Sequence, residues 1–201
     1  MSDLRRCGQR RLSGDVRELI VSEFISLDGV VEAPGDEPTH PHAGWTMKFG
    51  SPELYEFKLH ETLEAQSLLL GRHTYEGFLA AWPSRDGPFA DKMNAMAKDV
   101  ATSSHVDPAW NASALDTPLR DSIARLKAGP GGPILVAGSA TLVKFLLSER
   151  LVDELRLMTY PVILGGGLGI FPDAHQRVDF DLVGTITFER GVELRTLRLK
   201  N

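Results

Sequence analysis

The feature that most constrains the fold is an alternation of short apolar runs with amphipathic segments. Residues 67–71 read SLLLG and residues 133–137 read PILVA, and each run leads directly into a segment with helical signals. Strands that alternate with helices are joined by crossover connections, which give a largely parallel sheet covered by helices on both faces. We therefore expect a three-layer α/β/α sandwich.

Other segments extend this alternation. The run ELIVSEFISL at residues 18–27 is rich in β-branched and aromatic residues and precedes the turn pair Asp28-Gly29, which indicates a strand. Residues 31–50 hold three prolines, three glycines and two histidines with little periodicity, and predict a long loop. Further strands are expected at 98–102 and 152–164, and helices at 51–65, 73–80, 116–129 and from Ser139 onward.

Caps mark the starts of several predicted helices. Ser51 is a typical N-cap because Pro52, which follows it, is favoured at the first helical position. Asp116 or Thr117 is the expected cap of the helix at 116–129, and Ser139 that of the next helix.

The last two segments, residues 180–189 and 192–200, alternate apolar and polar residues around Arg190-Gly191. This pattern is typical of a β-hairpin. The expected sheet is therefore mixed, mostly parallel, with a C-terminal antiparallel hairpin. An edge strand of this hairpin could pair with a second copy of the chain, and we expect a homodimer.

Length and composition predict one domain. A chain of 201 residues with 42% hydrophobic content can bury one sizeable core. Residues 1–17 carry five arginines without the apolar stretch of a secretory signal or membrane anchor. We expect a disordered basic leader at 1–17, or alternatively a partner-binding tail, and a folded domain at 18–201.

The charge balance narrows the partners. A formal net charge of −5 provides no basic field for nucleic acid or an anionic membrane, so we expect a small-molecule substrate. The single cysteine, Cys7, cannot form an internal disulfide, which favours a cytoplasmic location. His40 and His42 lie among prolines without a cysteine or a spaced carboxylate pattern, so no metal site is expected.

The segment LGRHTYE at residues 70–76 is a candidate phosphate site. It places Gly71 at the end of a buried strand and Arg72, His73 and Thr74 at the start of a helix. Ligands of open α/β sheets bind at the carboxyl ends of strands, and a helix N-terminus offers N–H groups to phosphate. A plain turn beside a solvated arginine explains the same residues equally well.

Three more strand ends carry candidate ligand-binding residues. The segment TSSH after the strand at 98–102 offers Thr102, Ser103 and Ser104 as donors that would suit the 2′-phosphate of NADPH, or it is a simple loop. The segment AGSATL is either a capped strand-to-helix junction or a place where Gly138 lets the backbone approach a diphosphate. The run GGGLG, including Gly165 and Gly166, is either a flexible turn or closes over a ligand.

Together and in this order, these segments resemble the dihydrofolate reductase fold over roughly residues 18–200. The motif LGRHTYE is the most specific part of the resemblance, and SLDG at 26–29, the strand with LVDEL and the LGGG turn are closer to the riboflavin-pathway reductase domain. The resemblance implies NADPH as the cofactor. It implies contacts with the cofactor from Gly71, Arg72, His73, Thr74, Ser103, Ser104, Gly138, Ser139, Ala140 and Thr141.

The resemblance also implies hydride transfer to a C=N or C=O carbon of a pterin-like or pyrimidine-like substrate. A rough alignment with the substrate-binding helix of dihydrofolate reductase lands on Glu53. We hypothesise that Glu53 or Asp28 orients the substrate, with Thr159 facing the same pocket, and a buried acid there would have a raised pKa. The alternative is a non-catalytic NADP(H)-binding or ligand-sensing protein of the same fold.

Overall fold

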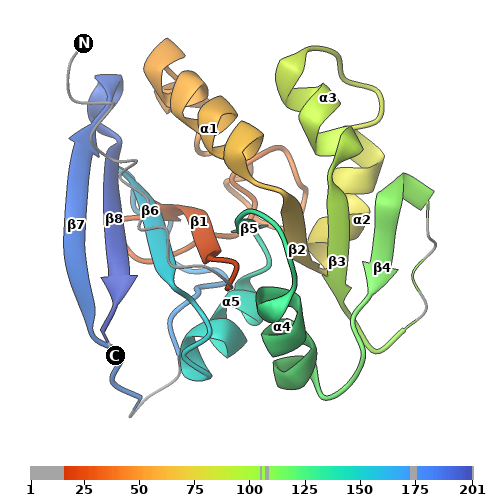
Figure 1. The fold of residues 1–201 in the computed structure, drawn as a ribbon. Coiled ribbons are helices and arrows are strands. Elements are labelled where there is room, and N and C mark those ends of the chain that lie inside the picture. Colours follow the sequence, from red (N-terminus) through yellow and green to blue (C-terminus); the bar gives the residue numbers. More distant parts are fainter. Residues whose placement is uncertain (1–15, 105, 107–108, 173–175, 201) are drawn as a thin grey trace.

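The computed structural model describes residues 16–104, 106, 109–172 and 176–200. In this part of the chain one sheet of eight strands has the order β4-β3-β2-β5-β1-β6-β8-β7 (Figure 1). Strands β1 to β6 pair in parallel, whereas β8 runs antiparallel to both β6 and β7. The strands are β1 (Leu19–Ser26), β2 (Ser67–Gly71), β3 (Ala97–Ala101), β4 (Ala112–Ala114), β5 (Ile134–Ala137), β6 (Glu154–Tyr160), β7 (Phe180–Thr187) and β8 (Glu193–Leu199).

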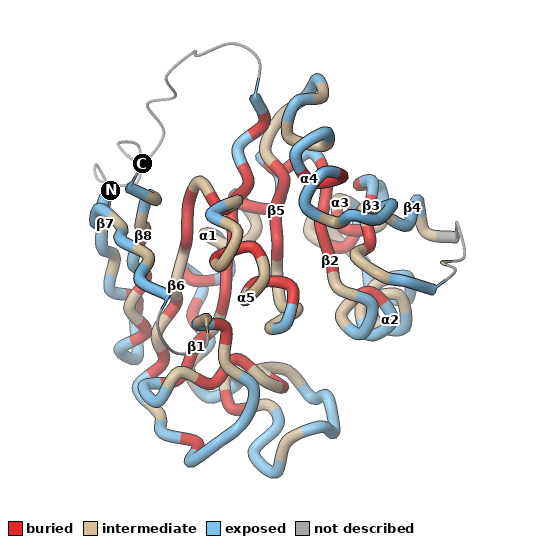
Figure 2. Tube along the Cα trace, turned by 90° about the horizontal axis from the view of Figure 1, so that it is seen from below, coloured by how far each residue is buried: buried red, intermediate tan, exposed pale blue. Residues whose placement is uncertain are grey.

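Helices cover both faces of the sheet, so the predicted three-layer sandwich is confirmed. On one face, Ile123 of α4 and Leu146 of α5 pack against Val21 of β1. On the other face, Tyr75 of α2 packs against Leu70 of β2, and the central strands between these layers are largely buried (Figure 2). The helices are α1 (Pro52–Glu64), α2 (Arg72–Ala81), α3 (Pro88–Ala95), α4 (Leu119–Ala128) and α5 (Ala140–Ser148), with 3-10 turns at Met47–Phe49, Ala109–Asn111 and Glu189–Gly191.

Alternation along β1 assigns its side chains to the two faces. Leu19, Val21 and Ile25 belong to the core under α4 and α5, whereas Ile20 belongs to the core under α2 and α3. Successive residues of a strand point to opposite faces, so Glu23 lies on the α5 face and Ser22 on the α1 face. No helix in the described residues combines the length and the apolarity needed to span a bilayer.

The folded domain begins earlier than expected. Arg17 is buried, and its guanidinium donates hydrogen bonds to the Gly132 carbonyl at 2.8 Å and to the Ser67 hydroxyl at 2.7 Å. Arg17 is therefore part of the domain and not of the leader. The rest of the expected leader, residues 1–15, lies outside the described residues.

Two other predictions need correction, and two elements were not predicted. Helix α4 starts only at Leu119 because Pro118, with extended backbone angles, is its N-cap, so neither Asp116 nor Thr117 caps it. The strand expected at 152–164 ends at Tyr160, because Pro161 has no N–H to continue the ladder. Helix α3 and the three-residue edge strand β4 were not predicted. The N-cap at Ser51 is confirmed, since its hydroxyl accepts the Leu54 N–H at 3.2 Å.

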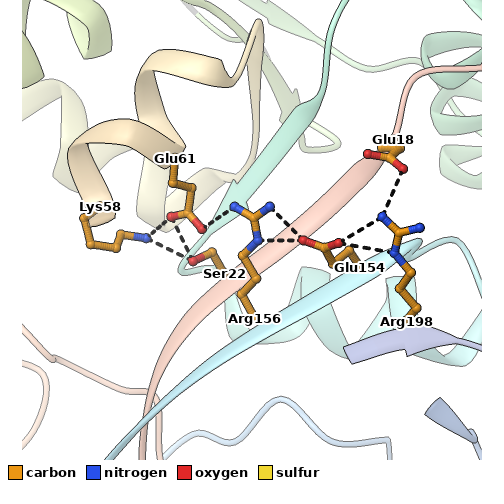
Figure 3. Close-up of polar contacts among 7 residues, drawn as sticks. All are labelled: Glu18, Ser22, Lys58, Glu61, Glu154, Arg156 and Arg198. Atoms are coloured by element: carbon orange, nitrogen blue, oxygen red, sulfur yellow. Dashed lines mark hydrogen bonds and ion pairs between the residues drawn. The ribbon is translucent and has the colours of Figure 1, made fainter. Parts of the chain in front are cut away.

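An ionic network centred on the buried Glu61 and its partner Arg156 holds α1 to the sheet (Figure 3). The carboxylate of Glu61 is ion-paired with Lys58 on its own helix and with Arg156 of β6 at 3.0 Å. Burial alone would raise the pKa of Glu61, but the two cations outweigh it and lower the pKa. The network comprises Glu18, Ser22, Lys58, Glu61, Glu154, Arg156 and Arg198.

Replacing Glu61 by Ala tests this network. The substitution leaves two partly buried cations, Lys58 and Arg156, without the carboxylate that neutralises them. We therefore expect the free energy of unfolding at neutral pH to fall by about 3–5 kcal/mol in urea denaturation. The pKa of Glu61 is lower in the folded state than in the unfolded state. The contribution of Glu61 to the free energy of unfolding is therefore full above its unfolded-state pKa and is lost as the pH falls through its folded-state pKa. The difference in the free energy of unfolding between the wild type and Glu61→Ala should therefore become smaller at acidic pH.

The matched control is Glu56→Ala, which removes an exposed carboxylate from the same helix. Its effect should stay within about 0.5 kcal/mol. Equal losses in the two variants would contradict a stabilising role for the network.

Candidate functional site

The candidate site lies along the carboxyl edge of the parallel strands. The strands that lead into the predicted cofactor-binding and substrate-orienting residues are consecutive in the sheet, in the order β3-β2-β5-β1-β6. Because these five strands are parallel, their carboxyl ends form one rim. Four spacings of about 4.8 Å give this rim a length of roughly 19 Å.

The ends of β2 and β5 are in direct contact. The Gly71 N–H donates a hydrogen bond to the Ser139 hydroxyl at 2.8 Å. A Cβ atom on Gly71 would lie 3.2 Å from that of Ser139, so only glycine fits without a shift. Ser139 was expected to cap α5 with its side chain, and this is wrong: its hydroxyl makes no cap hydrogen bond because it holds Gly71 instead.

A second contact reinforces the first. Gly138 has a φ of 69°, and a Cβ atom built on it would lie 3.0 Å from Cγ2 of Thr74 in the first turn of α2. Ser139 also has a φ of 69°, a left-handed conformation that costs a non-glycine residue of order 1–3 kcal/mol. The two strand-to-helix junctions, 71–74 and 138–141, are thus packed together as one unit.

Both helices that start at this unit lack a side-chain cap on their first-turn N–H groups. Such N–H groups and the helix dipole favour an anion. Arg72, the first residue of α2, is half-exposed and ion-paired with Glu76 at 2.8 Å. His73 is exposed beside it, and Ala140 and Thr141 form the first turn of α5.

The predicted 2′-phosphate segment lies next along the rim. The register pairs Ala101 of β3 with Gly71, which places Thr102 beside Arg72. The Ser104 N–H donates to the Thr102 hydroxyl at 3.1 Å, and Ser103 is exposed. These hydroxyl groups lie on the surface where an anionic group could reach them.

At the other end of the rim, Asp28 joins the turns after β1 and β6. Its carboxylate accepts hydrogen bonds from the Ser26 hydroxyl at 2.6 Å and the Gly165 N–H at 2.7 Å. The Ser26 hydroxyl, followed by the N–H groups of Gly165 and Leu164, lowers the pKa of Asp28 to about 2. Asp28 is exposed and its pKa is lowered, so the burial that would have raised its pKa is not present. Its role in orienting a substrate stays a prediction.

A pocket of about 350 Å³ opens beside Asp28. One ring nitrogen of His40, Nε2, lies 2.7 Å from the Gly166 carbonyl oxygen, and the other, Nδ1, accepts the His42 N–H at 3.1 Å. In this arrangement Nδ1 acts as an acceptor and Nε2 faces a carbonyl oxygen. The described residues contain no group of three His, Cys, Asp or Glu side chains arranged for a metal ion. The lining residues are His40, Pro41, His42, Leu164, Gly165, Gly166 and Gly167.

The structure does not bring Glu53 and Thr159 into one pocket. Glu53 is exposed on the first turn of α1, a helix whose Leu54 packs in the core on the Tyr160 face. Thr159 pairs with Ile25 and therefore lies on the opposite, α5 face of the sheet. Strand alternation therefore separates Thr159 from Glu53, whereas the alternative in which Asp28 and Thr159 face one pocket stays a prediction.

The sequence reasoning missed Glu23, in the middle of β1. Its side chain is buried on the α5 face, and its carboxyl group accepts the N–H of Gly138. Burial, partly offset by Lys58 and this N–H, raises the pKa of Glu23 to about 8. The available signal was a charged residue inside the apolar run ELIVSEFISL.

Comparison with known proteins assigns the family. The model of the RibD C-terminal domain matches residues 17–194. The chain belongs to the RibD C-terminal domain family. A curated relative, the uncharacterized protein YyaP of Bacillus subtilis (strain 168), is 26% identical over 181 residues, covering 88% of this chain and 92% of the relative.

Two solved structures share the fold of this RibD C-terminal domain. A protein of Shewanella sp. PV-4, whose name provisionally assigns it to riboflavin biosynthesis, has a TM-score of 0.71 at 21% identity, with 92% of this chain and 99% of that chain covered. Dihydrofolate reductase from Enterococcus faecalis, solved with NADP(H), has a TM-score of 0.59 at 18% identity, with coverages of 92% and 97%. The resemblance to the dihydrofolate reductase fold is thereby confirmed.

Gly138→Ala tests the packed junctions of this domain. The added Cβ meets Thr74 and the left-handed backbone angle disfavours alanine, so we expect a loss of roughly 1–3 kcal/mol in the free energy of unfolding. Gly77→Ala is the control, because Gly77 lies in α2 with open space around it and should gain about 0.5–1 kcal/mol. Thermal or urea unfolding measures both, and a neutral Gly138→Ala would contradict the close packing.

Proposed function

We propose that this protein is an NADPH-dependent reductase that transfers a hydride to a C=N or C=O carbon of a small pterin-like or pyrimidine-like heterocycle. The observation that carries the proposal is the packed unit formed by Gly71 with Ser139 and Gly138 with Thr74. It places two uncapped helix N-termini side by side at the rim, next to Arg72. This donor set fits a diphosphate.

The order of the strand ends along the rim indicates how the cofactor would lie across the sheet. Thr102, Ser103 and Ser104 at the end of β3 would hold the 2′-phosphate, and the junctions after β2 and β5 would hold the diphosphate. The nicotinamide would then extend toward β1 and β6. The bound dinucleotide would supply the hydride, while the chain supplies position and charge.

The pocket beside Asp28 is the proposed substrate site. It lies at the nicotinamide end of the rim, between the loop with His40 and the glycine turn at 165–167. Its volume of about 350 Å³ lies at the lower end of the range typical of small-molecule sites. The ionised Asp28 holds this turn to β1 through the N–H groups of Leu164 and Gly165, so it shapes the pocket.

A second candidate is a non-catalytic NADP(H)-binding protein. The state of Asp28 favours this candidate. Its carboxylate is ionised and accepts hydrogen bonds from backbone N–H groups of the glycine turn, so it has no proton to donate at this pocket. NADPH oxidation, followed by absorbance against pterins, pyrimidines, quinones and imines, separates the two candidates. Binding without oxidation of the cofactor supports the second.

Arg72→Ala tests the cofactor site. The guanidinium would make a charge-assisted bond to phosphate worth ~1.5–3 kcal/mol, so we expect the Kd for NADPH to rise about ten- to a hundredfold in a calorimetric or fluorescence titration. NADH, which lacks the 2′-phosphate, should bind the wild-type protein more weakly than NADPH.

The control is Arg177→Ala, because Arg177 is an exposed arginine in an ion pair with Asp179 just before β7, at the opposite edge of the sheet. Its removal changes the net charge by the same amount and should leave the Kd unchanged. If both variants weaken binding alike, general electrostatics accounts for the affinity. No binding of NADPH by the wild-type protein would refute the proposed function.

A further inference from the structure

Glu23 lies directly beneath the junction proposed to hold the diphosphate. The register pairs Ser22 with Ala137, the last residue of β5, so Glu23 is beside Gly138. Its side chain is only 4% exposed. Its carboxyl group accepts the Gly138 N–H, and Oε1 has no hydrogen-bond partner in the described residues.

The hydrogen bond acts on the residue just before the strained Ser139. Gly138 and Ser139 are consecutive residues with a φ of 69°. Only Ser139 pays a cost for this left-handed conformation, because glycine adopts it freely, and the Gly71 N–H on the Ser139 hydroxyl supports it. The Glu23 carboxyl acts on the preceding residue, Gly138. Glu23 therefore shares in fixing the shape of the junction.

The charge of Glu23 matters because of its position. Two charged groups of α1 act on Glu23 from the other face of the sheet: Lys58 lowers its pKa and Glu61 raises it. On its own face, the first turn of α5 carries no acidic residue. With a pKa of about 8, the carboxyl group is mostly neutral at pH 7 and becomes charged in mild base. A buried anion at this point would repel a diphosphate.

We propose that Glu23 is a positioning residue of the cofactor site: its neutral carboxyl group holds the Gly138–Ser139 junction in the shape that accepts a dinucleotide diphosphate, and its ionisation weakens dinucleotide binding. The proposal rests on the proposed function, since it concerns the same site. It predicts that NADPH binding above pH 7 is accompanied by partial uptake of a proton by the protein.

The test is calorimetric titration with NADPH between pH 6.5 and 9.5. The wild-type Kd should rise about tenfold across this range, which corresponds to an upward shift of about one unit in the pKa of Glu23 on binding. Glu23→Gln keeps an acceptor for the Gly138 N–H but cannot ionise, so its Kd should match that of the wild type at pH 6.5 and rise less at pH 9.5. Glu23→Leu lacks the acceptor and should bind more weakly at every pH.

The control is Glu18→Gln, at the amino end of β1 and away from the junction, which should follow the wild-type pH profile. Repeating the titration at pH 8 in buffers of different ionisation enthalpy should detect proton uptake in the wild type and little in Glu23→Gln. A Glu23→Gln profile that rises as steeply as that of the wild type overturns the proposal and leaves the proposed function intact. Absence of NADPH binding at every pH overturns both.

A measurement on the unaltered protein covers the case in which the variants do not fold. Carbon-13 NMR of the glutamate carboxyl groups should show one group titrating near pH 8, and its midpoint should rise when NADPH is added. An unchanged midpoint in the presence of bound NADPH would also overturn the proposal.

Discussion

The contact between two strand-to-helix junctions determines the shape of the candidate site. Gly71 and Ser139 are 68 positions apart, yet the N–H of one donates to the hydroxyl of the other at 2.8 Å. This approach requires β2 and β5 to be neighbours in a parallel sheet, since only then do their carboxyl ends and the helices that follow lie side by side. It also requires glycine at 71 and 138, where a side chain would meet Ser139 or Thr74. The backbone groups exposed at the rim follow from these two conditions.

Three acids illustrate how the fold assigns charge. Glu61 is buried but ionised, because Lys58 and Arg156 neutralise it, and it fastens α1 to the sheet. Asp28 is exposed and ionised, and its backbone partners tie β1 to the glycine turn. Glu23 is buried beside a single N–H, so burial dominates and its pKa is raised. The same functional group therefore fastens a helix, shapes a pocket or supports a junction according to its neighbours.

Much of the fold could be predicted from the sequence because the signals are local. The run SLLLG, the cap at Ser51 and the turn at Arg190-Gly191 each indicate an element through residues near one another in the chain, and the structure has all three elements. The site was less accessible, because it depends on contacts between distant segments. Nothing local shows that the Ser139 hydroxyl serves Gly71 and not its own helix, or that Glu23 meets Gly138. Likewise, Glu53 and Thr159 fall on opposite faces only once strand alternation and helix placement are known together.

The central claim is that an anionic dinucleotide binds over the packed junctions. The most direct measurement is an amide NMR titration of the isotopically labelled protein with NADPH, with assigned signals for Gly71, Gly138 and Ser139 and with Gly184 of β7 as an internal reference. The account predicts that the largest shifts fall on residues 71–74, 102–104 and 138–141, while Gly184 stays unchanged. Saturable shifts confined to other parts of the sheet, with these three segments unaffected, would contradict it.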